Sequence, residues 1–479
     1  MRGKPALAAL LTTAWACVFA GAPSPPRVRF IPFSDARIIF DGLPAAVPEA
    51  FRGMGDENRA ATWPAWVARR DREIRARLEQ GEEDTLTNFL LFGTSFTHHP
   101  RITLAMLDRA RASPESALDS ASAFGAILQA RAEDLVAAAA AQEPGERLEF
   151  ARSVIERQGL SLTTHESRSK AVEYLVRHFV QVAKEYDRDA ELLKAANNRG
   201  SEKEGLLTRS TLFQDRGVSL DTSWQPNFAI EQSLAALKSK GLLTAESVQR
   251  VAVIGPGLDF TDKEEGYDFY PPQTIQPFAV FDSLVRLGLA RAGTLQITTI
   301  DVSARVNDHI AHARQRALAG APYTIQLTLD PAVNWKPDAA TYWKEWGSAI
   351  GASTQALKPP AEAGPVETRA LKVRAEILAQ VTPRDLNVVL ERLELNDARE
   401  QFDLVIATNV LAYYNLFDQG LALQNIGAML RQDGFFLSND ALVQIRGCAL
   451  RSVGSAGVSY SDRKEDADYV IWYRKQEER

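Results

Sequence analysis

The sequence is poor in cysteine. Only Cys17 and Cys448 occur among 479 residues, which is too few for a disulfide framework or for a cysteine metal cage. The sequence also lacks the Gly-x-Ser-x-Gly elbow of many hydrolases and the Gly-x-x-x-x-Gly-Lys loop that cradles phosphates. We therefore expect no metal site, and neither a serine hydrolase nor a P-loop enzyme is indicated.

The chain has no excess of basic charge. Its 55 lysines and arginines face 61 aspartates and glutamates, a formal net charge of -6, so no nucleic-acid partner is expected. No apolar run of about 18 residues or more marks a transmembrane helix. The hydrophobic share of 45% is that of an ordinary globular protein, and the length predicts two or three domains.

The first 22 residues have the pattern of a signal peptide. Arg2 and Lys4 precede an apolar stretch, residues 6–20, which ends in small residues suited to cleavage. This pattern predicts an exported or periplasmic protein. A misassigned start, which would leave the protein in the cytoplasm, and an N-terminal membrane anchor are the alternatives.

Three regions of different pattern follow. Residues 27–62 are punctuated by proline and glycine and predict an extended lead-in segment. Residues 63–200 carry apolar side chains at helical spacing and predict an all-helical domain. Residues 205–479 alternate short apolar runs with helical patterns, which predicts an α/β domain with a doubly wound, mostly parallel sheet. An insertion is expected at about residues 322–370, and the last two runs predict a hairpin at the sheet edge.

One apolar run ends in a Gly-x-Gly turn. Residues 251–254 lead into Gly255, Pro256 and Gly257, and glycine lets the backbone approach a ligand closely. A plain strand-to-helix turn has the same residues. Phe260 stands where a dinucleotide fingerprint has its third glycine, which counts against a nicotinamide or flavin site.

Polar residues follow three later runs. Asp301 follows residues 295–300, where a carboxylate can accept hydrogen bonds from both hydroxyls of a ribose; a helix cap is the plainer alternative. Asp385 follows residues 377–381, and Asn409 follows residues 402–407. Ligands of doubly wound sheets bind beyond the carboxyl ends of the strands, so the three side chains are expected near one cleft.

In this order the motifs resemble the class I S-adenosylmethionine-dependent methyltransferases. Phe402-Asp403-Leu404-Val405 and the Leu430-to-Gly434 turn continue the pattern, and the stretch from Thr408 to Tyr414 is similar to the chemotaxis-receptor glutamate methyltransferase branch. The resemblance covers about residues 205–479. It implies a Rossmann-like domain with seven strands, S-adenosylmethionine as the cofactor, and a small-molecule or protein methyl acceptor.

The resemblance also implies which residues hold the cofactor. Gly255 and Gly257 would face its methionine and ribose, Asp301 its ribose hydroxyls, and Asp385 its adenine amino group. The full set implied for the cofactor is Gly255, Pro256, Gly257, Asp259, Asp301, Val302, Asp385, Leu386 and Asn409.

Two positions depart from the family pattern. Val253 stands where the family has an acid two residues before the first glycine, and Asp259 is a candidate substitute for that acid. Asp433 stands at the first position of the usual Gly-Gly pair before the fifth strand.

The segment after the glycine turn is polar and aromatic. It predicts either a lid over the site, formed by Tyr267, Asp268, Tyr270 and Gln273, or a surface loop. Tyr413 is a further candidate for positioning the acceptor.

Two other groups of side chains are explained by structural roles alone, without a binding site. The group of Asp308, His309 and His312 predicts a solvated helix face rather than a metal site. Trp343 and Trp346, at helical spacing in the insertion, predict a packing face.

Two other functions remain open. A non-catalytic exported binding or scaffold protein on a methyltransferase fold agrees with the export signal and with Val253. An aminopropyltransferase-like enzyme shares the glycine turn, but its acidic catalytic site is expected near the fourth strand, where Ala407, Thr408 and Asn409 stand.

Overall fold

A computed structural model describes residues 26–102, 106, 123–179, 224–259, 267–463 and 466–476. The expected signal peptide and the expected domain boundary near residue 200 lie outside these residues. In the part of the chain that the structure describes, no helix is both long enough and apolar enough to cross a membrane.

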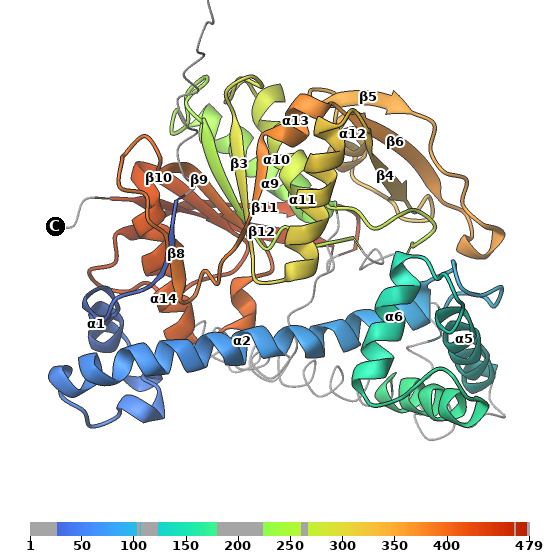
Figure 1. The fold of residues 1–479 in the computed structure, drawn as a ribbon. Helices are drawn as coiled ribbons and strands as arrows, with labels where there is room; N and C mark the ends of the chain where they lie inside the picture. Colours follow the sequence, from blue (N-terminus) through green and yellow to red (C-terminus); the bar gives the residue numbers. More distant parts are fainter. Residues whose placement is uncertain are drawn as a thin grey trace, which may run out of the picture.

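A seven-stranded sheet forms the centre of the molecule (Figure 1). Across the sheet the strands are β7 (Val381–Asp385), β3 (Gln296–Asp301), β2 (Arg250–Ile254), β9 (Phe402–Ala407), β10 (Leu430–Ser438), β12 (Ala467–Lys475) and β11 (Leu450–Ser459). The first five are parallel, whereas β12 runs antiparallel to both of its neighbours. The doubly wound, mostly parallel sheet and the final hairpin are thus confirmed, and the order fits the Rossmann-like fold implied by the resemblance.

Helices cover both faces of this sheet. Alternate side chains of a strand point to opposite faces: Val251 and Val253 belong to one buried cluster, and Ala252 and Ile254 to another. The first cluster includes α9 (Gln225–Ser239), α10 (Gln276–Arg286) and α11 (Ala304–Leu318). The second includes α1 (Phe33–Gly42) and α14 (Leu416–Met429).

The insertion forms a separate small sheet. Its strands β4 (Tyr323–Leu329), β6 (Glu367–Val373) and β5 (Gly351–Thr354) pair antiparallel, and they accompany α12 (Pro337–Glu345) and η3 (Ala361–Ala363). Trp343 and Trp346 are buried in the first cluster, which confirms the packing face. A short helix, α13 (Ala375–Ala379), then returns the chain to β7.

The lead-in segment is not extended as a whole. Only β1 (Val28–Phe30) is a strand, and it pairs with β8 (Glu391–Leu393). It is followed by α1, η1 (Pro44–Ala46) and η2 (Glu49–Phe51). The expectation was wrong because the segment carries apolar side chains that the sheet domain buries. Phe40 of α1, for example, packs edge-on against Phe417 of α14, with ring centroids 5.1 Å apart.

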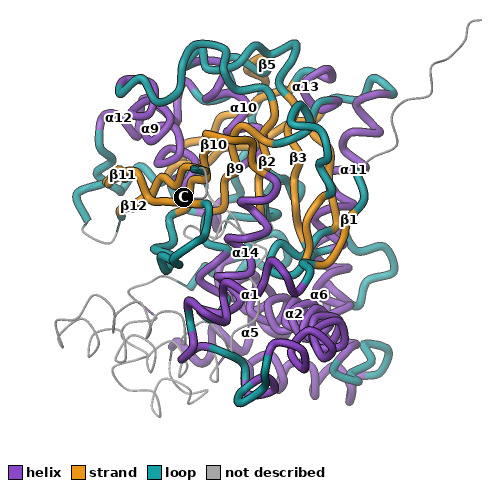
Figure 2. Tube along the Cα trace, turned by 90° about the vertical axis from the view of Figure 1, so that its left-hand side faces the viewer, coloured by secondary structure: helices purple, strands orange, loops and turns teal. Residues whose placement is uncertain are grey.

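The boundary expected at residue 63 is also wrong, because it cuts through one helix. The long helix α2 spans Asp56–Phe92 and runs below the sheet (Figure 1). Its first half, with Trp66 and Ile74, belongs to the second sheet cluster. Its second half packs with α5 (Ala123–Ala139), α6 (Glu146–Arg157) and a helix over residues 165–179. Figure 2 shows these helices gathered on one side of the strands.

Candidate functional site

The Gly-x-Gly turn lies at the carboxyl end of β2. Gly255 and Gly257 have φ values of +63° and +67°, in the left-handed region that costs other residues roughly 1–2 kcal/mol. A Cβ on Gly255 would lie 2.5 Å from Cγ2 of Val410. Strand order reverses between β2 and β9, and such a switch point is where doubly wound sheets bind ligands.

Asp301 ends the neighbouring strand β3 and is largely buried, with 9% of its surface exposed. Its Oδ1 accepts a hydrogen bond from the backbone N of Ser303 at 2.8 Å. Burial raises the pKa of Asp301 to about 7, although the backbone amides of Ser303 and Val302 favour the charged form. The alternative that Asp301 caps the following helix is therefore correct in part. Ser303 is the actual N-cap of α11, and Asp301 holds the backbone that leads into it.

Asp385 stands beside Asp301 in the sheet register, at the end of β7. Its Oδ1 accepts a hydrogen bond at 2.7 Å from Nη1 of Arg75, which comes from α2. The same guanidinium binds Asp71 at 3.1 Å and Glu391 at 3.4 Å. Three carboxyl groups therefore surround the guanidinium of Arg75, and Asp301 stands beside one of them, Asp385, in the strand register.

The remaining cofactor-set residues at this edge are placed mainly by backbone contacts. The carbonyl of Val302 accepts a hydrogen bond from Arg75 at 3.4 Å. The backbone N of Leu386 donates to the carbonyl of Asp301 at 3.2 Å, and the Leu386 side chain is buried. Pro256 is buried inside the glycine turn.

Asn409 lies at the end of β9 in a left-handed conformation, φ +56°. Its side chain and backbone pair with Asn439 of the next strand end, at 2.9 and 2.7 Å. Asp440 then accepts hydrogen bonds from the backbone N atoms of Leu411 and Ala412, at the start of η4 (Leu411–Tyr413). The expected groups thus lie at the same ends of the parallel strands.

Asp259 is committed to the protein interior. Its Oδ2 accepts a hydrogen bond from the side chain of Gln273 at 2.8 Å, and both residues are buried. Gln273 also joins β4 by two hydrogen bonds of 2.8 Å to the backbone of Gln326. Asp259 therefore serves first to anchor the segment after the glycine turn to the insertion.

Of the two alternatives for the segment that holds residues 267–270, the surface loop is wrong, because the helical region packs against this segment. Asp268 is buried and accepts hydrogen bonds from the backbone N atoms of Thr94 at 2.7 Å and Ser95 at 3.0 Å. Arg147 of α6 donates to the carbonyls of Asp268 and Tyr270. The guanidinium of Arg101 lies 4.5 Å from the centre of the Tyr267 ring. A lid role for these residues stays a prediction.

Val253 is fully buried in the first sheet cluster. An acid at this position would place its carboxyl group among apolar side chains, which is costly without a partner. The departure from the family pattern is therefore matched by its surroundings in this fold.

Helix α2 supplies contacts that sequence reasoning missed. Besides Arg75, Arg70 binds Asp418 at 2.6 Å, and Arg77 donates to the carbonyl of Tyr413 at 2.9 Å. Tyr413 itself is half-buried. The helix thus crosses the edge where β3, β7 and β9 end. No local signal could have placed Arg75 there, since 310 residues separate it from Asp385. The sequence analysis also missed Asn439 and Asp440, although both directly follow the apolar end of β10.

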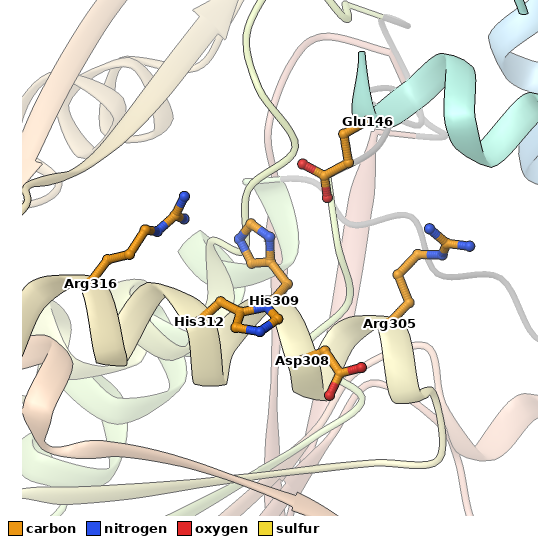
Figure 3. Close-up of a pocket in the computed structure, with 6 residues that line it drawn as sticks. All are labelled: Glu146, Arg305, Asp308, His309, His312 and Arg316. Carbon is orange, nitrogen blue, oxygen red and sulfur yellow. The ribbon is translucent and has the colours of Figure 1, made fainter. Parts of the chain in front are cut away.

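A polar cavity of about 490 Å³ lies between α11 and the start of α6 (Figure 3). Its lining includes Glu146, Asp308 and His312, all exposed, and the half-buried His309. His309 Nε2 lies 3.0 Å from the hydroxyl of Tyr323, and burial lowers the pKa of His309 to about 4. The solvated helix face is therefore correct for Asp308 and His312 and wrong for His309. Among the described residues, no group of three or more His, Cys, Asp and Glu side chains could hold a metal ion.

No family model and no curated protein matches the chain. Among solved structures, it is similar to the N-methyltransferase NodS from Bradyrhizobium japonicum WM9, at 14% identity over 52% of this chain and 95% of that one, with a TM-score of 0.25. The magnesium protoporphyrin IX methyltransferase from Synechocystis PCC 6803 matches at 10% identity over 52% and 79%, with a TM-score of 0.25. An O-methyltransferase family protein from Burkholderia thailandensis matches at 12% identity over 78% and 93%, with a TM-score of 0.25. At such scores the likeness carries no argument, and the fold rests on the order and direction of the strands.

Proposed function

We propose that the protein binds S-adenosylmethionine at the carboxyl edge of its sheet and transfers the methyl group to an acceptor. One observation carries the proposal. A left-handed Gly-x-Gly turn at the switch point stands beside Asp301, a buried carboxylate at the end of the next strand. A buried carboxylate that ends the second strand is suited to the two hydroxyls of a ribose.

The charges of this edge fit such a cofactor. Asp71, Asp385 and Glu391 surround the guanidinium of Arg75, and Asp301 stands beside Asp385 in the strand register. When bound, S-adenosylmethionine supplies a methyl group on a positively charged sulfur. The acidic groups favour a cation there, and the glycine turn leaves backbone rather than side chain facing the ligand.

Each residue has a positioning task in this proposal. Asp301 accepts from the ribose hydroxyls, and Asp385, held through Oδ1 by Arg75, offers its other oxygen to the adenine amino group. Asn409 and Tyr413 line the side where the acceptor lies. Methyl transfer from a sulfonium is an in-line displacement, so the protein contributes mainly by holding the two reactants in line. The likeness of the Thr408–Tyr414 stretch to the chemotaxis-receptor branch belongs to this proposal.

Calorimetric titration of the full chain with S-adenosylhomocysteine tests the cofactor site. We expect micromolar affinity, weakened at least tenfold by Asp301→Ala, a change of about 1.4 kcal/mol. Asp308→Ala is the matched control, because Asp308 is an exposed acid on the helix that follows Asp301. Absence of binding up to about 1 mM ligand in a folded sample, a binding free energy near -4 kcal/mol, would sink the proposal.

A non-catalytic binding protein on the same fold is the second candidate. Three observations favour it: Val253 is buried among apolar side chains, Asp259 is held by Gln273, and Arg75 engages Asp385. Binding of S-adenosylhomocysteine together with no methyl transfer from labelled S-adenosylmethionine to cell extract would favour this candidate. An aminopropyltransferase-like activity would instead appear as transfer from the decarboxylated cofactor.

We also propose that the first 22 residues direct export. The mass of the protein recovered from the host would then be that of a chain lacking this segment. Recovery of the uncleaved chain in the cytoplasm would contradict export.

A further inference from the structure

A cavity of about 830 Å³ lies at the amino-terminal ends of the parallel strands, whereas the candidate cofactor site lies at their carboxyl ends. The strand register shows this, because Leu430 at the start of β10 pairs with Phe402, the first residue of β9. The cavity is formed where β10 and β11 begin and β12 ends. The lining residues that matter here are Asp433, Arg446, Cys448, Arg451, Arg474 and Gln476.

The lining is basic although the chain is acidic. Among the lining residues that the structure describes, three arginines face one acid, Asp433, a formal charge of +2 (three minus one) in a chain whose net charge is -6. Asp433 binds Nη2 of Arg474 at 3.1 Å. Among the described residues, no acid lies within ion-pair distance of Arg446 or Arg451. The cavity therefore attracts an anion.

Two of the arginines stand directly opposite each other. Arg451 of β11 pairs with Arg474 of β12 in the antiparallel register, so both side chains lie on one face of the hairpin. Like charges in this arrangement destabilise a strand pair. An anion between the two guanidiniums would turn this repulsion into attraction.

Both guanidiniums are held before any ligand arrives. That of Arg474 lies 5.7 Å from the centre of the Phe435 ring and is paired with Asp433. Nη1 of Arg451 donates to the carbonyl of Ile445 at 3.1 Å.

We propose that this cavity binds a small organic molecule that carries a phosphate group. A phosphate monoester has a charge of about -1.5 to -2 at neutral pH, which matches the charge of the lining. Guanidinium forks fit phosphate oxygens in a bidentate manner. Sites for organic ligands have volumes of about 300–1,000 Å³, so the cavity has room beyond the phosphate, against the apolar sides of Cys448 and Ile38.

Calorimetric titration of the full chain with phenyl phosphate, inorganic phosphate and benzoate tests this proposal. Phenyl phosphate is expected to bind at least tenfold tighter than benzoate, which has a single charge, and tighter than inorganic phosphate, which lacks an organic part. Binding should weaken when the salt concentration rises, because the interaction is between charges near the surface. Equal affinity for phenyl phosphate and benzoate would overturn the phosphate assignment, and equal affinity for the two phosphates would overturn the organic part.

Variants locate the binding. Arg446→Gln and Arg451→Gln are each expected to weaken phenyl phosphate at least fivefold. Arg399→Gln is the matched control, since Arg399 is an exposed arginine paired with Asp397 outside the cavity, and it should leave the affinity unchanged. Thermal unfolding of each variant verifies its fold, and Arg446, being exposed, provides the variant least able to disturb it. Unchanged affinity in a folded Arg446→Gln and Arg451→Gln double variant would overturn the proposal.

Discussion

Burial governs the titration of Asp301. Its pKa of about 7 in the folded protein lies well above the ordinary value of about 3.9 for an aspartate. Between about pH 4 and 7 the folded chain therefore binds a proton that the unfolded chain has released. The contribution of Asp301 to the free energy of unfolding is therefore fully present below about pH 4, decreases between about pH 4 and 7, and is lost above about pH 7.

Asp301→Asn should accordingly raise the melting temperature at pH 8 by a few degrees. The amide has the same shape, its oxygen still accepts from the backbone N of Ser303, and it carries no charge to bury. The difference from the wild type should shrink towards pH 4. Thermal unfolding of the ligand-free chain across this range measures it, with the exposed Asp308→Asn as control. A difference that is constant with pH would contradict the role of burial.

The glycine turn gives a second test at the scale of single residues. Gly255→Ala places a Cβ against Val410 and keeps a left-handed backbone. Gly241→Ala is the matched control, because Gly241 has φ +68° but no atom within 4 Å of the added Cβ.

The left-handed backbone costs both variants roughly 1–2 kcal/mol, and crowding costs Gly255→Ala about 1–3 kcal/mol more. Urea denaturation measures both losses. Adding Val410→Ala should recover part of the extra loss at Gly255. Equal losses for the two glycine variants would show that the close approach to Val410 is unimportant.

The residues at the edge of the sheet were predictable from the sequence, but their partners were not. Gly255 and Asp301 follow apolar runs directly and Asn409 follows one after Thr408, so a strand pattern is enough to mark these three. Asp385 ends a strand of its own, β7, and most of the apolar run before it belongs to the helix α13. The pairing of Asp385 with Arg75 depends on how distant helices pack. A short-range pattern holds no record of such contacts, which is why Asp259 was expected to face the cofactor rather than Gln273.

At the scale of elements, α2 acts as a strap across the edge where the strands end. Arg75 joins the ends of β3 and β7 by its contacts with the Val302 carbonyl and Asp385. Strands and their helices were predictable because each has its own period of apolar residues. The position of α2 across the strand ends was not predictable, because a helical pattern shows that one face of a helix is buried but does not show which element covers that face.

Arg75→Gln tests the strap. Loss of its charged hydrogen bonds should cost about 1.5–3 kcal/mol of unfolding free energy. Arg72→Gln, an exposed arginine one turn earlier on α2, should change stability by less than about 0.5 kcal/mol. Urea denaturation followed by tryptophan fluorescence compares the two. Equal urea midpoints for the two variants would show that the contacts of Arg75 do not stabilise the protein.

At the scale of the whole molecule, the helical region and the sheet share α2. Trp63 and Trp66 of its first half are buried in the sheet cluster, and Phe89 and Leu90 of its second half in the helical cluster. The segment before α2 adds Ile39, which is fully buried beside α14. The predicted domain boundaries at residues 63 and 200 were placed where the sequence pattern changes. The buried clusters are instead defined by which side chains contact each other, and α2 contributes to two of them.

The shared helix predicts that residues 205–479 alone, although they contain every strand of the seven-stranded sheet, do not form a stable native domain. Removing the lead-in segment and α2 exposes the apolar side chains of β2, β9 and α14 that these elements cover. Truncation of one buried tryptophan, such as Trp63 of α2, typically costs about 3–5 kcal/mol, whereas the total free energy of unfolding of a protein is about 5–15 kcal/mol. The fragment should bind the dye ANS and lose near-ultraviolet circular dichroism, as expanded states do, whereas the full chain should do neither. A fragment that unfolds cooperatively without binding the dye would show that the sheet is complete without α2.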